Sequence, residues 1–198
     1  MDIILGSASP RRKDILSGIL ESFRILIPDI DETRLRAEDP VLYSRRMALE
    51  KADSLLSRFT PALKTLIITS DTIVVIDGII LGKPSSHENA VEMLKTLNGR
   101  THRVITSVAL SRIDPGGNKM SWVDHDITHV TFKKLDDAGI KKYLSMIDFM
   151  DKAGAYAMQE HGRCIIEKYE GSITNIIGLP LRLIFRMLAA SEIIGEII

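Results

Sequence analysis

The chain has 198 residues, of which 45% are apolar and 26% charged, an ordinary composition for a globular protein. Its 26 lysines and arginines balance its 26 aspartates and glutamates, so no overall positive charge attracts DNA, RNA or an anionic membrane. We therefore expect no bulk nucleic-acid binding, and any anion site must be a local cluster of cations.

Cysteine usage and the distribution of charge predict a cytoplasmic protein without a membrane span. The single cysteine, Cys164, cannot form an internal disulfide, and its apolar neighbours predict that it packs as a small apolar side chain. Charged and helix-breaking residues interrupt the start before a signal peptide could develop. From Leu179 onward, leucine and isoleucine alternate with charges too often for a bilayer span, and Leu181, Ile184, Phe185 and Leu188 form the stripe of an amphipathic helix.

The opening stretch predicts a strand, a turn and a helix in direct succession. Residues 2–5 form the strand, Gly6-Ser7-Ala8 the turn, and Ser9-Pro10 the start of the helix, with serine as N-cap and proline at the first helical position. Arg11 and Arg12 then lie in the first turn beside unpaired backbone N–H groups, which favours a bound anion such as phosphate. The alternative is an ordinary capped helix with solvated arginines.

An acidic turn and a long helix follow. Residues 23–27 predict a second strand that leads into Pro28-Asp-Ile-Asp-Glu32, where the Glu32 carboxylate could hold a divalent cation or belong to a solvated loop. Asp39-Pro40 begins a helix that we expect to reach about Phe59. Lys51 lies on this helix outside the apolar stripe, so by itself it is interpreted as a solvated lysine.

The second informative stretch is a strand pair joined at Asp77-Gly78, the strongest short signal for a β-hairpin. Asp71 interrupts the apolar run in the middle of the first strand. A buried carboxylate is costly unless it is paired, hydrogen-bonded or bound to metal, which favours a functional role over an aspartate at a strand end. Lys83 stands between Gly82 and Pro84 just after the second strand, where a restricted backbone would hold its positive charge in a fixed position.

The rest of the chain alternates helices and strands. We expect a helix after Ser85, a long hairpin that turns at residues 115–118, a helix that ends near Met146, and a strand over Arg163 to Tyr169. Residues 151–159 are small and interpreted as unsuited to a core but able to line a pocket.

Several ordered blocks together resemble the Maf family of house-cleaning nucleoside triphosphate pyrophosphatases, which is associated with septum formation. The resemblance extends from residue 3 to about residue 188. The blocks are Ser7-Ala-Ser-Pro-Arg-Arg12, Asp31-Glu32, Leu49-Glu-Lys-Ala52, Ser70-Asp-Thr-Ile-Val74, Gly82-Lys-Pro84, Gly99-Arg-Thr-His102, Asp151-Lys-Ala-Gly154 and Gly178-Leu-Pro-Leu181.

The resemblance implies an α/β fold and a hydrolytic activity. The fold would be a single domain over residues 1–198, with two lobes about a twisted mixed sheet, flanking helices and a deep central cleft, usually as a homodimer. The activity would be hydrolysis of a nucleoside triphosphate to the monophosphate and pyrophosphate with Mg²⁺ or Mn²⁺. By similarity, Asp71 would be the catalytic base and share the metal with Glu32, while Ser7, Arg12, Lys51 and Lys83 would line the cleft.

Within the family, the segment that ends at Gln159 is similar to the branch that acts on dTTP and UTP, and Arg11, Thr72 and Gln159 match the positions that set this preference. The chain departs from the branch at Glu160-His161, where a glycine usually follows the glutamine, and at Ile173, where tyrosine is common. The alternative function is a nucleotide-binding regulator of cell division in which catalysis is secondary.

Overall fold

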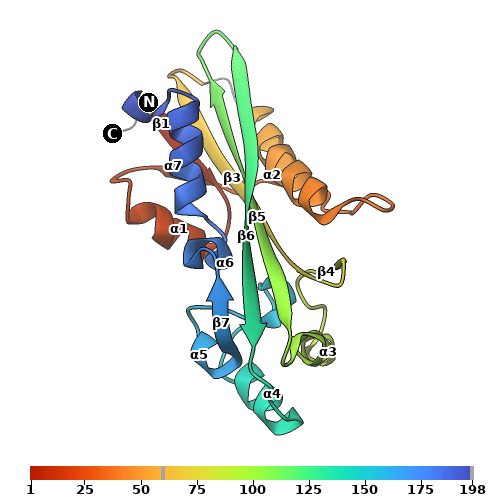
Figure 1. The fold of residues 1–198 in the computed structure, drawn as a ribbon. Coiled ribbons are helices and arrows are strands. Elements are labelled where there is room, and N and C mark those ends of the chain that lie inside the picture. The colour runs from red at the N-terminus through yellow and green to blue at the C-terminus, as the bar shows by residue number, and fades with distance from the viewer. Residues whose placement is uncertain (59–60, 197–198) are drawn as a thin grey trace. The chain divides into compact units, whose positions relative to one another are not determined.

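The computed structural model describes residues 1–58 and 61–196, which contain a mixed seven-stranded sheet with helices beside it (Figure 1). The strands follow the order β2-β1-β3-β5-β6-β7, and β4 pairs with β3. Their bounds are β1 (Asp2–Gly6), β2 (Arg24–Leu26), β3 (Thr65–Ile76), β4 (Ile79–Leu81), β5 (Thr101–Ile113), β6 (Lys119–Phe132) and β7 (Ile166–Glu170). The helices are α1 (Pro10–Ser17), α2 (Pro40–Leu56), α3 (His87–Leu97), α4 (Asp137–Leu144), η1 (Ala153–Ala155), α5 (Gly162–Ile165), α6 (Ile173–Ile177), α7 (Leu181–Ala190) and η2 (Ile194–Glu196). The predicted α/β class is confirmed.

The chain forms two compact units. Unit 1 comprises Met1–Asp71, Thr106–Asp126 and Gly178–Ile198, and unit 2 comprises Thr72–Ile105 and Ile127–Ile177. Strands β3, β5 and β6 each contribute residues to both units. The single domain and the central cleft stay predictions.

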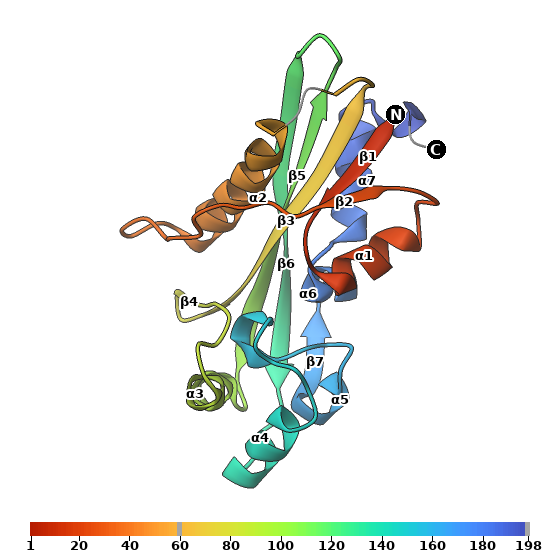
Figure 2. The same ribbon diagram turned by 180° about the vertical axis from the view of Figure 1, so that it is seen from behind.

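Alternation along parallel strands β1 and β3 explains the two cores of unit 1. Because successive side chains of a strand point to opposite faces, Ile3 and Leu5 pack with α1 and α7 on one face, while Ile4 packs with α2 on the other. Leu66, Ile67 and Ile68 of β3 repeat this pattern in register with β1. Unit 1 is therefore a sheet with helices on both faces (Figure 1 and Figure 2).

The cap of helix α2 was predicted correctly. The Asp39 side chain accepts hydrogen bonds from the backbone N–H groups of Val41 at 2.8 Å and Leu42 at 3.3 Å, and Pro40 occupies the first helical position. The helix ends at Leu56. The predicted end, Phe59, lies outside the described residues.

Unit 2 has its own apolar core. Side chains from β3, α3, β5, β6 and α4 meet the η1 segment there, with Phe132 and Tyr143 as the largest fully buried residues. The hairpin between β3 and β4 turns at Asp77 and Gly78, whose φ angles of 51° and 77° match the predicted turn.

Three sequence predictions in unit 2 are wrong. Residues 151–159 are not excluded from the core, because Ala155 and Tyr156 are buried in it. The predicted strand over residues 163–169 begins as helix α5 and becomes β7 only at Ile166. Cys164 is exposed rather than packed, because helix α5 buries Gly162 and Ile165 and leaves Cys164 on its outer side.

Among the described residues, no helix combines the length and apolar character required to cross a bilayer. Helix α7 buries Leu183, Ile184, Met187 and Leu188, so the amphipathic helix is confirmed. Its buried face is rotated from the predicted stripe, since Phe185 is 36% exposed.

Candidate active site

Asp71 is a buried carboxylate in the middle of β3, as the sequence predicted, and only 8% of the residue is exposed. Its Oδ1 accepts a hydrogen bond from Lys51 Nζ at 2.7 Å. Its Oδ2 is buried and has no hydrogen-bond partner among the described residues. One oxygen is therefore held by an ammonium group, and the other keeps its acceptor capacity.

Lys51 connects Asp71 with Glu32. Its Nζ lies 2.7 Å from Asp71 Oδ1 and 2.9 Å from Glu32 Oε1, and the lysine side chain is 11% exposed. The interpretation of Lys51 as a solvated lysine is wrong, because its side chain is buried and pairs with two carboxylates. Sequence periodicity could not show this, since it does not reveal that β3 places a carboxylate next to this part of α2. The structure thus brings together three of the predicted site residues, from the β2–α2 loop, α2 and β3.

Glu32 is the more exposed carboxylate of the cluster, with a side chain that is 49% exposed. The Tyr43 hydroxyl donates a hydrogen bond of 2.8 Å to the Glu32 backbone oxygen. Burial, together with the negative charges of Asp71 and Glu32, raises the pKa of Tyr43 to about 12. Tyr43 therefore keeps its proton at neutral pH. The sequence analysis missed this residue, since no motif marks a tyrosine that bonds to a distant backbone oxygen.

Arg12 is anchored by backbone and hydroxyl groups instead of being solvated. Its Nε donates to Gly178 O at 2.9 Å, and its Nη1 donates to Ser70 O at 2.8 Å and to Ser7 Oγ at 3.3 Å. Burial lowers the pKa of Arg12, while the charge of Asp71 opposes this shift. Arg12 thus lies within the electrostatic reach of Asp71.

Helix α1 begins at Pro10, directly after the turn that carries Ser7. Ser9 is at the N-cap position, as predicted, but its side chain makes no capping hydrogen bond. Arg11 is half-buried in the first turn. The predicted elements of a phosphate site are therefore present in unit 1: a helix N-terminus, two arginines and the Ser7 hydroxyl.

The remaining predicted residues belong to unit 2. Thr72 follows Asp71 in β3, Lys83 is exposed just after β4, and Gln159 is exposed after η1. Their roles at the site stay predictions.

The carboxylates of Glu32 and Asp71 fit a hard divalent cation. Both have an oxygen in contact with the same Lys51 nitrogen, so those oxygens are no farther apart than the sum of the two distances, 2.9 and 2.7 Å. The buried Asp71 Oδ2 offers a further acceptor. The described residues contain no group of three or more His, Cys, Asp or Glu side chains that could hold a metal ion. Mg²⁺ commonly binds through one or two carboxylates with water and phosphate oxygens completing its octahedral shell, so two carboxylates are sufficient.

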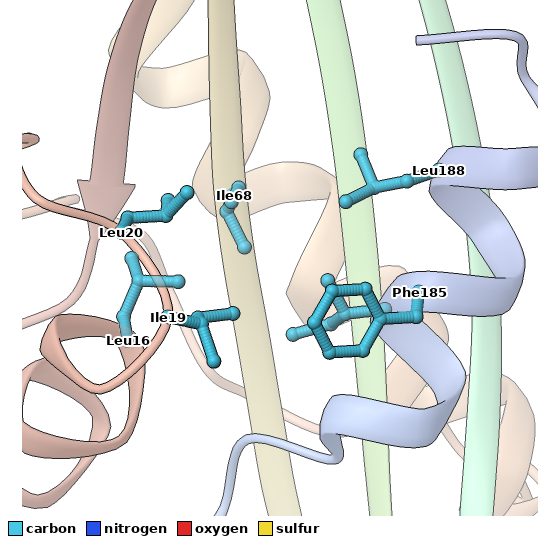
Figure 3. Close-up of a pocket in the computed structure, with 7 residues that line it drawn as sticks. Leu16, Ile19, Leu20, Ile68, Phe185 and Leu188 are labelled. Atoms are coloured by element: carbon cyan, nitrogen blue, oxygen red, sulfur yellow. The ribbon is translucent and has the colours of Figure 1, made fainter. Parts of the chain in front are cut away.

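A separate pocket in unit 1 is apolar and lies between α1, β3 and α7 (Figure 3). It is lined by Leu16, Ile19, Leu20, Ile68, Phe185 and Leu188 among others. These side chains offer neither a charge nor a hydrogen bond to a phosphate, which distinguishes this pocket from the charged cluster.

The fold and the cluster of Glu32, Lys51 and Asp71 describe an α/β protein with acidic and basic side chains gathered in unit 1. The family model described as "Maf-like protein" matches residues 2–191, and the chain therefore belongs to the Maf family.

Curated relatives cover nearly the whole chain. A dTTP/UTP pyrophosphatase of Chlamydia felis is 40% identical over 96% of this chain and 94% of its own length. The proteins of that name from Clostridioides difficile and Shewanella denitrificans are 41% and 43% identical, each over 91% of this chain and 90% and 91% of their own lengths. Among solved structures, the Staphylococcus aureus Ham1 protein matches 96% of this chain and 100% of its own, with 13% identity and a TM-score of 0.46.

Proposed function

We propose that this protein hydrolyses dTTP and UTP to the nucleoside monophosphate and pyrophosphate. The observation that carries the proposal is Asp71, a buried carboxylate with one oxygen fixed by Lys51 and the other without a partner among the described residues. The names of the curated relatives and the identity of about two residues in five support the same activity.

In the proposed reaction, water attacks the α-phosphorus of the nucleotide. The bond from this phosphorus to the oxygen that bridges to the β-phosphate breaks, and pyrophosphate leaves. Asp71 Oδ2 accepts the proton of the attacking water as general base, a role worth ~10²-fold or more in rate. Lys51 keeps the Asp71 side chain in place through its bond to Oδ1.

Cations of the chain neutralise the triphosphate. Arg11 and the N-terminus of α1 bind phosphate oxygens, the arginine through its forked donors. Arg12 contributes its positive charge, because its Nε and Nη1 already donate to Gly178 O, Ser70 O and Ser7 Oγ. Glu32 and Asp71 hold Mg²⁺ or Mn²⁺, which supplies charge neutralisation and orientation of the phosphate oxygens when it is bound.

Residues of unit 2 act on the same substrate in this proposal, by family resemblance. Lys83 binds the pyrophosphate end as a point charge. Thr72 and Gln159 select the base, and the Gln159 amide can pair with a uracil or thymine edge through its donor and acceptor. The unusual Glu160 lies 3.3 Å from Lys152 Nζ, and the same nitrogen lies 2.9 Å from Asp151 Oδ1, so one buried lysine pairs with two carboxylates within unit 2.

We further propose that the protein is cytoplasmic and forms a homodimer. Both follow the family resemblance, and no described helix could span a bilayer.

The test is pyrophosphate release from dTTP, UTP, CTP, GTP and 7-methyl-GTP with Mg²⁺ or Mn²⁺. We expect selective turnover of dTTP and UTP, and a loss of at least about 100-fold in Asp71→Asn with nucleotide binding retained. Turnover of 7-methyl-GTP alone would overturn the base preference. Tight nucleotide binding without turnover of any member of the panel would favour the regulator of cell division.

A further inference from the structure

The loop that carries Glu32 is fixed to helix α2 by side chains outside the acid and base cluster. It connects β2 with α2, and residues 31–37 are exposed. Tyr43 donates to Glu32 O at 2.8 Å, and Arg46 Nη2 donates to the next backbone oxygen, Thr33 O, at 3.2 Å. Both donors belong to the helix that also carries Lys51.

Glu38 completes the connection at the end of the loop. Arg46 binds its carboxylate through two parallel hydrogen bonds, Nε to Oε1 and Nη2 to Oε2, each 2.7 Å long. The Leu35 backbone N–H donates to Glu38 Oε2 at 3.1 Å, and the Glu38 side chain is only 9% exposed. The hydrogen bonds from Arg46 hold the pKa of Glu38 below its ordinary value.

This arrangement differs from an ordinary surface ion pair, which contributes little because two long side chains must be ordered in water. The Arg46 guanidinium is held in a forked geometry, and its Cζ lies 5.6 Å from the centre of the Tyr43 ring. Arg46 therefore orders both the loop backbone and the tyrosine that bonds to Glu32.

We propose that Glu38, Arg46 and Tyr43 are positioning residues that set the place of the Glu32 carboxylate and thereby the affinity of the site for its divalent cation. The inference rests on the proposed function, in which Glu32 and Asp71 hold Mg²⁺ or Mn²⁺. The reason is geometric. Glu32 is half-exposed on a loop, and without these bonds its carboxylate would sample positions away from Lys51 and Asp71. Partners that orient metal ligands commonly change metal affinity by about 10–100-fold when they are removed.

The experiment compares Glu38→Gln with Glu50→Gln. Glu50 is a matched control, because it also accepts a hydrogen bond from Arg46, at 3.1 Å, but lies on α2 and holds no loop atom. Mn²⁺ binding to the nucleotide-free protein is measured by electron paramagnetic resonance. We expect Glu38→Gln to weaken binding about tenfold or more and Glu50→Gln to remain within about twofold of the wild type.

Tyr43→Phe is the second variant, since it removes only the hydroxyl that donates to Glu32 and keeps the ring beside Arg46. We expect weaker Mn²⁺ binding, an unchanged melting temperature, and a higher Mn²⁺ concentration for half-maximal turnover with kcat restored at saturating Mn²⁺. A purely structural role would lower the melting temperature without this shift. If Glu38→Gln does not fold, Tyr43→Phe alone distinguishes a positioning role from a purely structural one.

The inference is overturned if the wild type binds no Mn²⁺ in the absence of nucleotide, or if folded Glu38→Gln and Tyr43→Phe bind it as tightly as the wild type. Failure of the proposed function is seen in a different assay, as absence of pyrophosphate release by the wild type. Because Mn²⁺ binding is measured without nucleotide, the two failures are distinguishable.

Discussion

Lys51 contacts two carboxylates, and this makes the cluster sensitive to the loss of one partner. Lys51→Met would leave Asp71 buried without its cation, which typically costs roughly 3 kcal/mol or more. We expect Lys51→Met to lower the free energy of unfolding by about that amount in urea titrations.

The double variant Lys51→Met/Asp71→Asn tests the cause of this loss. Removing the aspartate charge removes the need for its cation, so the double variant should be more stable than Lys51→Met alone. Equal or lower stability of the double variant would contradict the assignment of the loss to an unpaired carboxylate.

Because His102 is a buried titratable residue, we expect the free energy of unfolding to depend on pH. His102 is buried in unit 2, its Nε2 lies 2.9 Å from the Tyr156 hydroxyl, and burial lowers its pKa from 6.5 to about 4. The unfolded chain therefore binds the proton more readily than the folded chain. The stability that neutral His102 contributes is complete above pH 6.5 and is lost as the pH falls toward 4, by up to ~3 kcal/mol.

The variant His102→Gln should lose this part of the dependence, because glutamine keeps a hydrogen-bonding group but does not titrate. Unfolding free energies measured between pH 7 and 4 would check this, with His129→Gln as control since His129 is exposed on β6. A wild-type slope that persists in His102→Gln would contradict the assignment.

Among single residues, sequence analysis identified those whose local sequence pattern is unusual. Asp71 was found because a charge in an apolar strand is costly, and Arg12 because it stands in a first helical turn. Lys51 and Tyr43 escaped local reasoning, since their partners are 20 and 11 residues away in the chain. Only the family resemblance pointed to Lys51, and nothing pointed to Tyr43.

Among the elements, the end of β1 has the tightest packing requirement. A Cβ on Gly6 would lie 2.5 Å from Thr69 Cγ2 and 2.8 Å from Leu55 Cδ1, closer than real Cβ atoms approach. Glycine is thus required where β1 meets β3 and α2 just before the Ser7 turn. We expect Gly6→Ala to cost about 1–3 kcal/mol of stability and to reduce turnover.

Thermal unfolding of Gly6→Ala beside Gly116→Ala would test this. Gly116 lies in the β5–β6 turn, where a Cβ would meet its nearest neighbour, Asn118 Nδ2, at 3.9 Å. Equal melting temperatures for the two variants would contradict a packing role for Gly6.

Elements with strong local signals were predicted well, including the capped helix α2 and the hairpin at Asp77 and Gly78. Residues 151–159 were misread because small residues fit a pocket or a core equally well on composition. Contacts between distant segments decide that case. The Tyr143 hydroxyl accepts a hydrogen bond from Ala157 N at 3.1 Å and thereby anchors this segment within unit 2.

For the whole molecule, three strands contribute residues to both compact units. If one unit unfolded alone, β3, β5 and β6 would each have to lose their strand structure over part of their length. We therefore expect a single cooperative transition.

Two intrinsic probes can follow the unfolding of the two units separately. The only tryptophan, Trp122, belongs to unit 1, while three of the four tyrosines, Tyr143, Tyr156 and Tyr169, belong to unit 2. Tryptophan fluorescence and tyrosine absorbance should give the same urea midpoint. Two separate midpoints would contradict the predicted single domain.

The exposed Cys164 has a practical consequence. It is the only cysteine of the chain and lies in unit 2, whereas the only tryptophan lies in unit 1. A thiol-reactive acceptor dye attached there would form an energy-transfer pair with Trp122 without any engineered mutation. The efficiency of transfer would follow the distance between these two side chains in solution as nucleotide and divalent cation are added.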